Sequence, residues 1–401
     1  MRALSTLLGL PQHRFASIHV VGTNGKSSVT RMIAALLEAH GVSAGACVSP
    51  HAARWSERVL IHGREIGAAE FATAIERAAQ AAATVNRSLE EGEAVTQFEL
   101  ATAAAFVALA KARVEAAAIE AGLGGRLDAT NTIPSKVTVL TSVGLDHTEW
   151  LGESEEEIAA EKLAVLRDHS TLVLGRVSPT VGAIAEQTVA ERGAALIVAP
   201  EDPGEDVRLR APGGFQRRNF ALACAAAQAF LGELDREQVA RVANGIEIPG
   251  RLERVAEDPP TFLDAAHNPD GAKALADALS EVAEGRPAIA VLAILADKDA
   301  KAMIEALAPS LAQAACTDLP TAGGPQSGQA GHFEARRRSF GARELAGICA
   351  DAGLPAEEEV DFGAAVARGR ELALAAGGIL LVAGSHYALA PARAALGLTG
   401  K

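Results

Sequence analysis

The 401-residue sequence contains few aromatic residues, few cysteines and no long apolar run. Aromatic residues make up only 3% of the chain, so a hydrophobic core must be built mainly from Ala, Leu, Val and Ile. No stretch approaches the roughly 18 uncharged apolar residues that a membrane span requires. The N-terminal residues also lack the apolar segment and the cleavage site of a signal peptide. We therefore expect a cytoplasmic protein that has no membrane partner.

The cysteines are too scattered to form a framework. The sequence has four of them and contains no CxxC pair. This spacing argues against a structural zinc site or a set of disulfides, and it is typical of a reducing compartment. The four residues are Cys47, Cys224, Cys316 and Cys349.

Positive charge is also scarce. Lys and Arg number 37 against 50 Asp and Glu, which gives a formal net charge of −13. A protein that binds nucleic acid needs clustered basic residues to neutralise the phosphates, so we expect no nucleic-acid partner. A small anionic substrate held by a few local cations is still compatible with this balance.

Short apolar runs alternate with longer helical patterns along most of the chain. Alternation of this kind predicts an α/β fold with a parallel, doubly wound sheet. A second series of the same kind begins after Pro249-Gly250, so we divide the chain into domains at 1–248 and 249–401. Residues 320–336 are rich in Gly, Pro and Gln and are predicted to form a mobile loop in the second domain. The expected strands are 17–22, 44–48, 114–120, 137–144, 262–266, 288–295 and 377–384, and the clearest helical patterns are 28–41, 68–83, 96–112 and 153–167.

Chemically unusual residues follow the ends of these expected strands. In open α/β sheets, ligands bind beyond the carboxyl ends of the strands. The pattern therefore predicts that these residues gather on one ligand-binding edge. The residues concerned are 22–26, Ser49, Glu120, Asp146, His147, Asp264, Asp297 and Ser385.

The segment GTNGKSS, residues 22–28, lies between an expected strand and an expected helix. In that context, backbone N–H groups and the helix N-terminus can hold phosphates, with Lys26 as a point charge. Ser27 or Ser28 can offer a hydroxyl to Mg²⁺. The alternative is a glycine-rich turn with a surface lysine. We favour the phosphate loop because strand, loop, lysine, hydroxyl and helix all agree.

Two further segments carry possible metal ligands. Glu120 precedes a glycine-rich loop that includes Arg126 and Asp128, and its carboxylate suits Mg²⁺, which prefers oxygen. The alternative is a flexible turn with solvated charges. Asp146-His147 either contributes a ligand or caps the next element, and imidazole is an unusual ligand for Mg²⁺.

Three other sites have a structural interpretation beside the functional one. Lys162 lies in an acid-rich helical pattern, where an ion-paired surface lysine is the ordinary interpretation. The run 262–269, FLDAAHNP, suits a helix start with Asn268 as N-cap, and it also places Asp264 and His267 after a strand. Asp297-Lys298-Asp299 is either a helix cap or part of the site.

Taken together, these motifs resemble the folylpolyglutamate synthase/dihydrofolate synthase family of the Mur ligase superfamily. They occur in the order of that family between about residues 17 and 390, and the ordered set is far more specific than any one motif. Ser27 stands where the family usually has glycine. The matching runs are GTNGKSS, SPHAARWSERV, TQFELATAAAF, EAGLGGRLDATN, LDHTEWLG, EKLAVLR, PGRLE, DAAHNP and DKD.

The resemblance implies a P-loop ATPase domain followed by a smaller, Rossmann-like α/β domain, with ATP and Mg²⁺ bound in the cleft between them. It also implies that Lys162 is the lysine that family members carbamylate, and that Lys26, Lys162 and His267 act in catalysis. We expect His267 to orient phosphate or glutamate. The implied ATP contacts are Thr23, Asn24, Gly25, Lys26, Ser27, Ser28, Asn219, Arg251 and Asp264, and the implied metal ligands are Ser49, Glu120 and His147.

The implied activity is ATP-dependent addition of L-glutamate to a folate, to dihydropteroate, or to both, through an acyl phosphate. We expect a monomer whose partners are these small molecules. The substrate-binding residues are expected to be Thr96, Gln97, Phe98, Arg126 and Asp128.

Two rival functions stay open at this level. A peptidoglycan-precursor Mur ligase uses the same chemistry on another carboxylate, but it is expected to need a domain before the phosphate loop, where about 20 residues stand here. A non-catalytic nucleotide-binding switch is expected to show a guanine-reading NKxD motif, which the sequence lacks.

Overall fold

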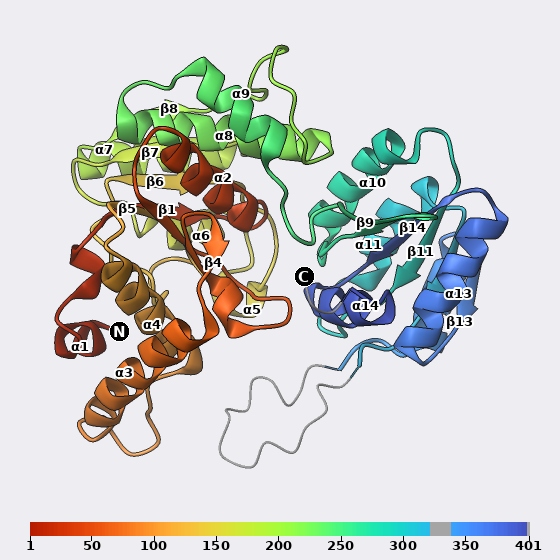
Figure 1. Ribbon diagram of the computed structural model, residues 1–401, viewed down its shortest axis with the longest axis horizontal. Helices are drawn as coiled ribbons and strands as arrows, with labels where there is room; N and C mark the ends of the chain where they lie inside the picture. The colour runs from red at the N-terminus through yellow and green to blue at the C-terminus, as the bar shows by residue number, and fades with distance from the viewer. Residues whose placement is uncertain (321–337, 399–401) are drawn as a thin grey trace. The chain divides into compact units, whose positions relative to one another are not determined.

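The computed structural model describes residues 1–320 and 338–398, and the chain forms two compact units (Figure 1). The first unit comprises residues 1–210 and 216–246, and the second comprises residues 211–215 and 247–401. The association of 211–215 with the second unit is a detail that the sequence does not indicate. The loop expected at 320–336 lies, apart from residue 320, outside the described residues.

The first unit is built on one eight-stranded sheet in the order β4-β3-β2-β5-β1-β6-β7-β8. All neighbouring pairs from β2 to β8 run parallel, whereas β3 and β4 form an antiparallel edge. The short β3–β4 edge was not predicted. The strands are β1 (Ala16–Val21), β2 (Ala44–Cys47), β3 (Val59–Ile61), β4 (Arg64–Glu65), β5 (Ala116–Glu120), β6 (Val137–Leu140), β7 (Thr171–Leu174) and β8 (Ala195–Val198).

Helices cover this sheet. One cluster of buried side chains joins α1, α3 and α4 to the β2–β3–β5 part of the sheet, and another joins α6 and α7 to β6 and β7. None of the helices in the described residues is long and apolar enough to cross a membrane. The helices are α1 (Arg2–Leu7), α2 (Lys26–Ala39), α3 (Ala68–Asn86), α4 (Gln97–Ala112), α5 (Thr148–Leu151), α6 (Glu155–Leu163), α7 (Pro179–Arg192), α8 (Gly214–Leu231) and α9 (Arg236–Gly245), with 3₁₀ turns η1 (Pro11–His13) and η2 (Trp55–Arg58).

The core of this unit consists largely of alanine, as the low aromatic content predicts. All five residues of β5 are buried, and three of them are alanine. Helix α4 buries Ala103, Ala104 and Ala105 together with Phe106, which has no exposed surface. Small side chains let a helix lie close to a sheet, so the few large residues become the main space-filling contacts.

The second unit contains a six-stranded sheet in the order β13-β12-β11-β14-β10-β9. All pairs are parallel except β9 with β10, so the expected fold class of two α/β domains is confirmed. Its elements are β9 (Glu253–Glu257), β10 (Pro260–Leu263), α10 (Pro269–Ala283), β11 (Ala288–Leu292), α11 (Ala300–Leu307), η3 (Ala308–Ser310), β12 (Gln313–Cys316), α12 (Ala342–Asp351), β13 (Ala356–Glu358), α13 (Phe362–Ala375), β14 (Ile379–Ala383), η4 (His386–Ala388) and α14 (Leu389–Ala395).

Helix starts agree with the sequence signals in most places. The Asn268 side chain accepts the Gly271 N–H at 2.8 Å, and Pro269 is the first residue of α10, as predicted. Ser154 caps α6, but the carboxylate of Glu157 accepts from the Glu153 amide. Only half of the capping box expected there therefore forms.

We predict that Phe106→Ala lowers the free energy of unfolding of the first unit by about 3–5 kcal/mol, because its ring fills space that alanines cannot. Both tryptophans, Trp55 and Trp150, belong to that unit, so their fluorescence during urea unfolding reports on it selectively. Leu127→Ala is the matched control, since Leu127 is 92% exposed. A similar loss in both variants would contradict this account of the core.

Candidate functional site

The phosphate-loop segment connects β1 to α2 and depends on two glycines. Gly22 has a φ of +150°, and a Cβ there would overlap the Thr141 side chain. Gly25 has a φ of +84° and is the N-cap of α2, and a Cβ would lie 2.7 Å from the Asn219 side-chain oxygen. Left-handed backbone and close neighbours together require glycine at both positions. Asn219, a predicted nucleotide contact, thus lies directly against the loop.

Residues after β6 hold the loop in place. The Thr23 amide donates to the Ser142 carbonyl at 2.8 Å, and the Asn24 amide donates to the Ser142 hydroxyl at 3.0 Å. The Thr141 hydroxyl in turn donates to the Asn24 carbonyl at 2.6 Å. These bonds anchor the first half of the loop, so the N-terminus of α2 stands at a fixed position where its free N–H groups favour an anion. The sequence did not single out Thr141 or Ser142, because ordinary hydroxyl residues carry no motif.

Lys26 and Lys162 meet at the same backbone atom. Each ammonium donates to the Gly22 carbonyl at 3.0 Å, although the two residues stand on different helices. Lys162 is buried, with 3% of its surface exposed. Burial, and then the positive charge of Lys26, lower the pKa of Lys162 to about 7. The ordinary interpretation of Lys162 as a solvated surface lysine is therefore wrong.

Glu120 joins three segments of the site. Its carboxylate accepts the Ser27 hydroxyl at 2.8 Å and the Ser49 amide at 2.9 Å. The Ser27 hydroxyl also lies 3.2 Å from the Ser49 carbonyl. Glu120 is only 2% exposed, so its carboxylate is buried among oxygen-bearing groups at the ends of β2 and β5 and the start of α2. Hydroxyl, carbonyl and carboxylate oxygens are the donors that Mg²⁺ prefers.

His147 is placed differently from Glu120. It is the N-cap of α5, with a φ of +53°, and its ring lies 3.8 Å from the Asp146 carboxylate. Its side chain is 41% exposed. Within residues 1–320 and 338–398, no three or more His, Cys, Asp and Glu side chains form a group that could hold a metal. His147 as a ligand therefore stays a prediction from the resemblance.

The glycine-rich loop after Glu120 packs against α6. A Cβ on Gly125 would lie 2.7 Å from the Glu161 carbonyl, so no larger residue fits. The Arg126 amide donates to that carbonyl at 3.1 Å, and its guanidinium pairs with the Glu161 carboxylate. The Arg126 side chain is otherwise exposed. Its contacts with Glu161 hold the glycine-rich loop against α6.

Aromatic and basic side chains gather above the same loop. The Phe98 ring occupies the space where Gly122 would carry a Cβ. The Arg58 guanidinium lies 4.4 Å from the centre of the Trp55 ring and 5.8 Å from that of Phe98, and it donates to His51 at 2.9 Å. Burial, and then Arg58, lower the pKa of His51 to about 4. The sequence pattern did not single out Trp55 and Arg58, although Trp55 is one of only two tryptophans and stands beside a basic residue, which was a usable signal.

Two of the predicted substrate residues, Thr96 and Asp128, accept hydrogen bonds from backbone amides. Thr96 caps α4, since its hydroxyl accepts the Glu99 amide at 3.2 Å. Gln97, the first residue of that helix, is exposed. The Asp128 carboxylate accepts the amides of Leu123 and Thr130, each at 2.9 Å, and burial raises its pKa. Asp128 thus organises the glycine-rich loop, whatever else it contacts.

Arg251, Asp264 and His267 belong to the second unit. The buried Asp264 carboxylate accepts the amides of Leu252 and Ala266, each at 2.7 Å, and burial raises its pKa. It thereby fixes the turn that carries Arg251. A ring nitrogen of His267 lies 2.9 Å from the Ala265 carbonyl.

Comparison with known proteins decides the family. The Mur ligase middle domain matches residues 20–197, and the Mur ligase glutamate ligase domain matches residues 250–386. A dihydrofolate synthase/folylpolyglutamate synthase of Mycobacterium tuberculosis is 35% identical over 345 residues, which are 77% of this chain and 71% of that protein. The chain belongs to the dihydrofolate synthase/folylpolyglutamate synthase family. The resemblance of the ordered motifs is confirmed, and the protein is an ATP-dependent ligase.

Solved structures of the family match the ligase over almost its full length. Folylpolyglutamate synthase of M. tuberculosis, solved with ADP and AMPPCP, has a TM-score of 0.89 at 30% identity and covers 99% of this chain and 94% of that one. FolC of Escherichia coli with DHPP and ADP has a TM-score of 0.82 at 26% identity, with 98% and 92% covered. The bifunctional synthase of Yersinia pestis with AMPPNP and a Mn ion has a TM-score of 0.80 at 28% identity, with 98% and 92% covered.

We predict that Lys162→Met changes how stability depends on pH. Folding lowers the pKa of Lys162 from 10.5 to about 7, so between these values the unfolded chain binds more protons. The contribution of Lys162 to stability therefore improves as pH rises through this window, and it is least favourable below about pH 7. In thermal unfolding in carbonate-free buffer, the stability of the variant relative to the wild type should be higher at about pH 6.5 than at about pH 9.5.

The exposed Lys136→Met is the control for this measurement. If the stability difference between Lys162→Met and the wild type is the same at every pH, the lowered pKa of the buried Lys162 is contradicted.

Proposed function

We propose that this ligase joins L-glutamate to the carboxylate of a folate, of dihydropteroate, or of both, and that ATP supplies the energy. The observation that carries the proposal is the phosphate loop at which Lys26, Lys162 and the Glu120–Ser27 pair converge. A member of this family that retains the loop and both lysines has the parts that phosphoryl transfer requires.

The proposed reaction has two steps. A carboxylate at neutral pH is a poor electrophile, so it first takes the γ-phosphoryl group of ATP, giving an acyl phosphate and ADP. The amine of glutamate then attacks the acyl carbon, the amide bond forms, and inorganic phosphate leaves as the nitrogen loses a proton. In the first step the loop amides and Lys26 hold and neutralise the transferring group.

We propose that the Lys162 side chain reacts with CO₂ and functions as a carbamate. An amine must be neutral to react with CO₂, and a pKa of about 7 supplies that form near neutral pH. The amine nitrogen bonds to the carbon of CO₂ and releases one proton, so the neutral amine becomes a carbamate anion. Counted from the ammonium form, two protons are lost and a buried positive charge becomes a negative one. The new carboxylate would then face Lys26 across the Gly22 carbonyl, and the repulsion between two ammonium groups becomes an attraction.

The residues around Glu120 suit a divalent cation. The buried carboxylate accepts from the Ser27 hydroxyl and the Ser49 amide, and an oxygen donor held in this way suits Mg²⁺. We propose that Ser27, Ser49 and Glu120 hold the ion, with His147 as a further ligand. A bound Mg²⁺ neutralises charge on the transferring phosphoryl group.

The folate-type substrate is proposed to lie on the Phe98 side of the glycine-rich loop. Trp55 and Arg58 extend that surface with an aromatic face and a cation, which suit a flat aromatic ring and an anionic tail. We also propose that the second unit helps to bind ATP and glutamate, through Arg251, Asp264 and His267.

We further propose that the ligase is a cytoplasmic monomer. The four cysteines are free, and a reducing compartment keeps thiols in that form. Light scattering of the purified protein measures the oligomeric state directly.

The function is tested by incubating the purified ligase with ATP, Mg²⁺, L-glutamate and either dihydropteroate or a reduced folate. Mass spectrometry should show product that has gained one or more glutamyl groups, together with ADP. Lys26→Ala should lower the rate at least about 100-fold, because the transferring group loses its main cation. Lys136→Ala, an exposed lysine, is the matched control.

Consumption of ATP with neither acceptor modified would instead favour a ligase for another carboxylate. An unchanged rate in Lys26→Ala would refute the phosphate loop itself.

The metal assignment gives a separate prediction. Glu120→Gln should weaken binding of Mn²⁺ together with AMPPNP at least about tenfold, since an amide lacks the charge of the carboxylate. Electron paramagnetic resonance of free Mn²⁺ measures this affinity without any turnover. Glu76→Gln, on the exposed face of α3, is the control, and equal affinity in both variants would remove Glu120 from the metal site.

A further inference from the structure

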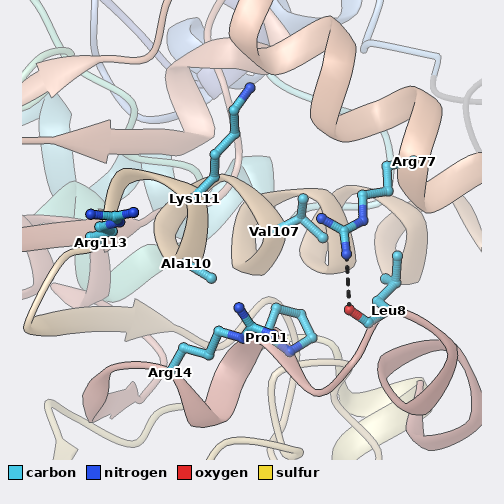
Figure 2. Close-up of a pocket in the computed structure, with 8 residues that line it drawn as sticks. All are labelled: Leu8, Pro11, Arg14, Arg77, Val107, Ala110, Lys111 and Arg113. Atoms are coloured by element: carbon cyan, nitrogen blue, oxygen red, sulfur yellow. Dashed lines mark hydrogen bonds between the residues drawn. The ribbon is translucent and has the colours of Figure 1, made fainter.

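The first unit has a pocket that none of the sequence motifs includes (Figure 2). Its volume is about 290 Å³, at the lower end of the range for small-molecule sites. Half of its lining is apolar and half is basic, and no acidic residue lines it. The apolar residues are Leu8, Pro11, Val107 and Ala110, and the basic residues are Arg14, Arg77, Lys111 and Arg113.

The sheet brings the basic residues together from distant parts of the chain. Arg14 stands just before β1, and Arg113 just before β5. These strands pair in parallel with Ala16 opposite Ala116, so both arginines lie at the amino ends of neighbouring strands.

The other two cations come from helices. Lys111 belongs to the last turn of α4, while Arg77 lies on α3 and donates to the Leu8 carbonyl at 3.4 Å. In Figure 2, Arg113 and Arg77 lie at opposite ends of the pocket, with Arg14 between them on the side of Pro11.

None of the four cations forms an ion pair with an acidic residue in the part of the chain that the structure describes. The nearby Glu115 turns its carboxylate to the Ser43 amide, at 2.9 Å. Four unpaired cations around an apolar floor repel one another, and they are unexpected in a chain of net charge −13. A bound anion would relieve that repulsion.

This pocket lies far from the phosphate loop. The loop follows the carboxyl end of β1, and the pocket adjoins the amino end of the same strand. A strand of six residues spans about 20 Å, so one phosphate chain cannot occupy both places. Ligands of open α/β sheets bind at the carboxyl edge, and a charged pocket at the other edge needs a separate explanation.

We propose that this pocket, named here the amino-edge pocket, binds a small organic anion with at least two carboxylate or phosphate groups. The planar guanidinium groups of Arg14, Arg77 and Arg113 can each donate two parallel N–H···O bonds to a carboxylate or to a phosphate. Several acidic groups are needed because the cations stand on different segments, and the apolar floor accommodates a carbon body. The proposal is independent of the ligase activity.

The test uses two probes, tricarballylate for carboxylates and inorganic pyrophosphate for phosphates, in metal-free buffer at constant ionic strength. Isothermal titration calorimetry compares the wild type, Lys26→Ala and the triple variant Arg14→Gln/Lys111→Gln/Arg113→Gln. All three pocket residues are exposed, so the triple variant should fold.

The matched control removes the same charge elsewhere on the first unit. It is Arg64→Gln/Arg236→Gln/Arg241→Gln, whose three arginines are also exposed.

The expected result is that at least one probe binds the wild type, Lys26→Ala and the control with similar affinity, and binds the triple variant at least about tenfold more weakly. The probe that loses affinity only in the triple variant identifies the acid group, carboxylate or phosphate, that the pocket prefers. The proposal is overturned if neither probe binds, if the control loses as much affinity as the triple variant, or if all binding disappears in Lys26→Ala.

Discussion

A buried carboxylate is the point on which the candidate site depends. Glu120 ends β5, and burial of a charge is costly unless hydrogen bonds compensate for it. The compensation comes from Ser27 at the start of α2 and from Ser49 after β2. This is possible only because β5 inserts between β2 and β1, which places the carboxyl ends of three strands side by side. The same strand order therefore assembles the phosphate loop, the metal-ligand candidates and the glycine-rich loop.

In this acidic protein, basic residues are clustered at two places on the first sheet, the phosphate loop and the amino-edge pocket. Lys26 and Lys162 share the Gly22 carbonyl, and burial, together with the nearby Lys26 ammonium, lowers the pKa of Lys162. Within the described residues, the hydrogen-bond partner of the Lys162 ammonium is this carbonyl rather than a carboxylate, which favours the neutral amine that the proposed carbamate requires. Basic residues also cluster at the amino-edge pocket, where four cations lie at the other edge of the sheet.

Small residues make the close contacts of the site possible. Glycine at 122 and 125 lets the loop lie under the Phe98 ring and against α6, and the alanines of β5 and α4 bring that helix onto the sheet. The few large side chains consequently carry more of the packing and recognition than they would in an aromatic-rich core. Phe98 and Trp55, with Arg58 between them, are the clearest example.

The sequence alone determined the α/β fold class and the family, because both depend on the order of local patterns along the chain. It also determined the helix cap at Asn268, which depends on adjacent residues. It did not reveal the antiparallel β3–β4 edge, whose strands are two or three residues long and too short for a periodic signal. Only the tertiary structure decided that Lys162 is buried, that Asp128 organises its own loop, and that the pocket residues between 14 and 113 meet. Burial and charge convergence arise from strand order and register, which contacts between distant segments fix, so no local pattern in the chain encodes them.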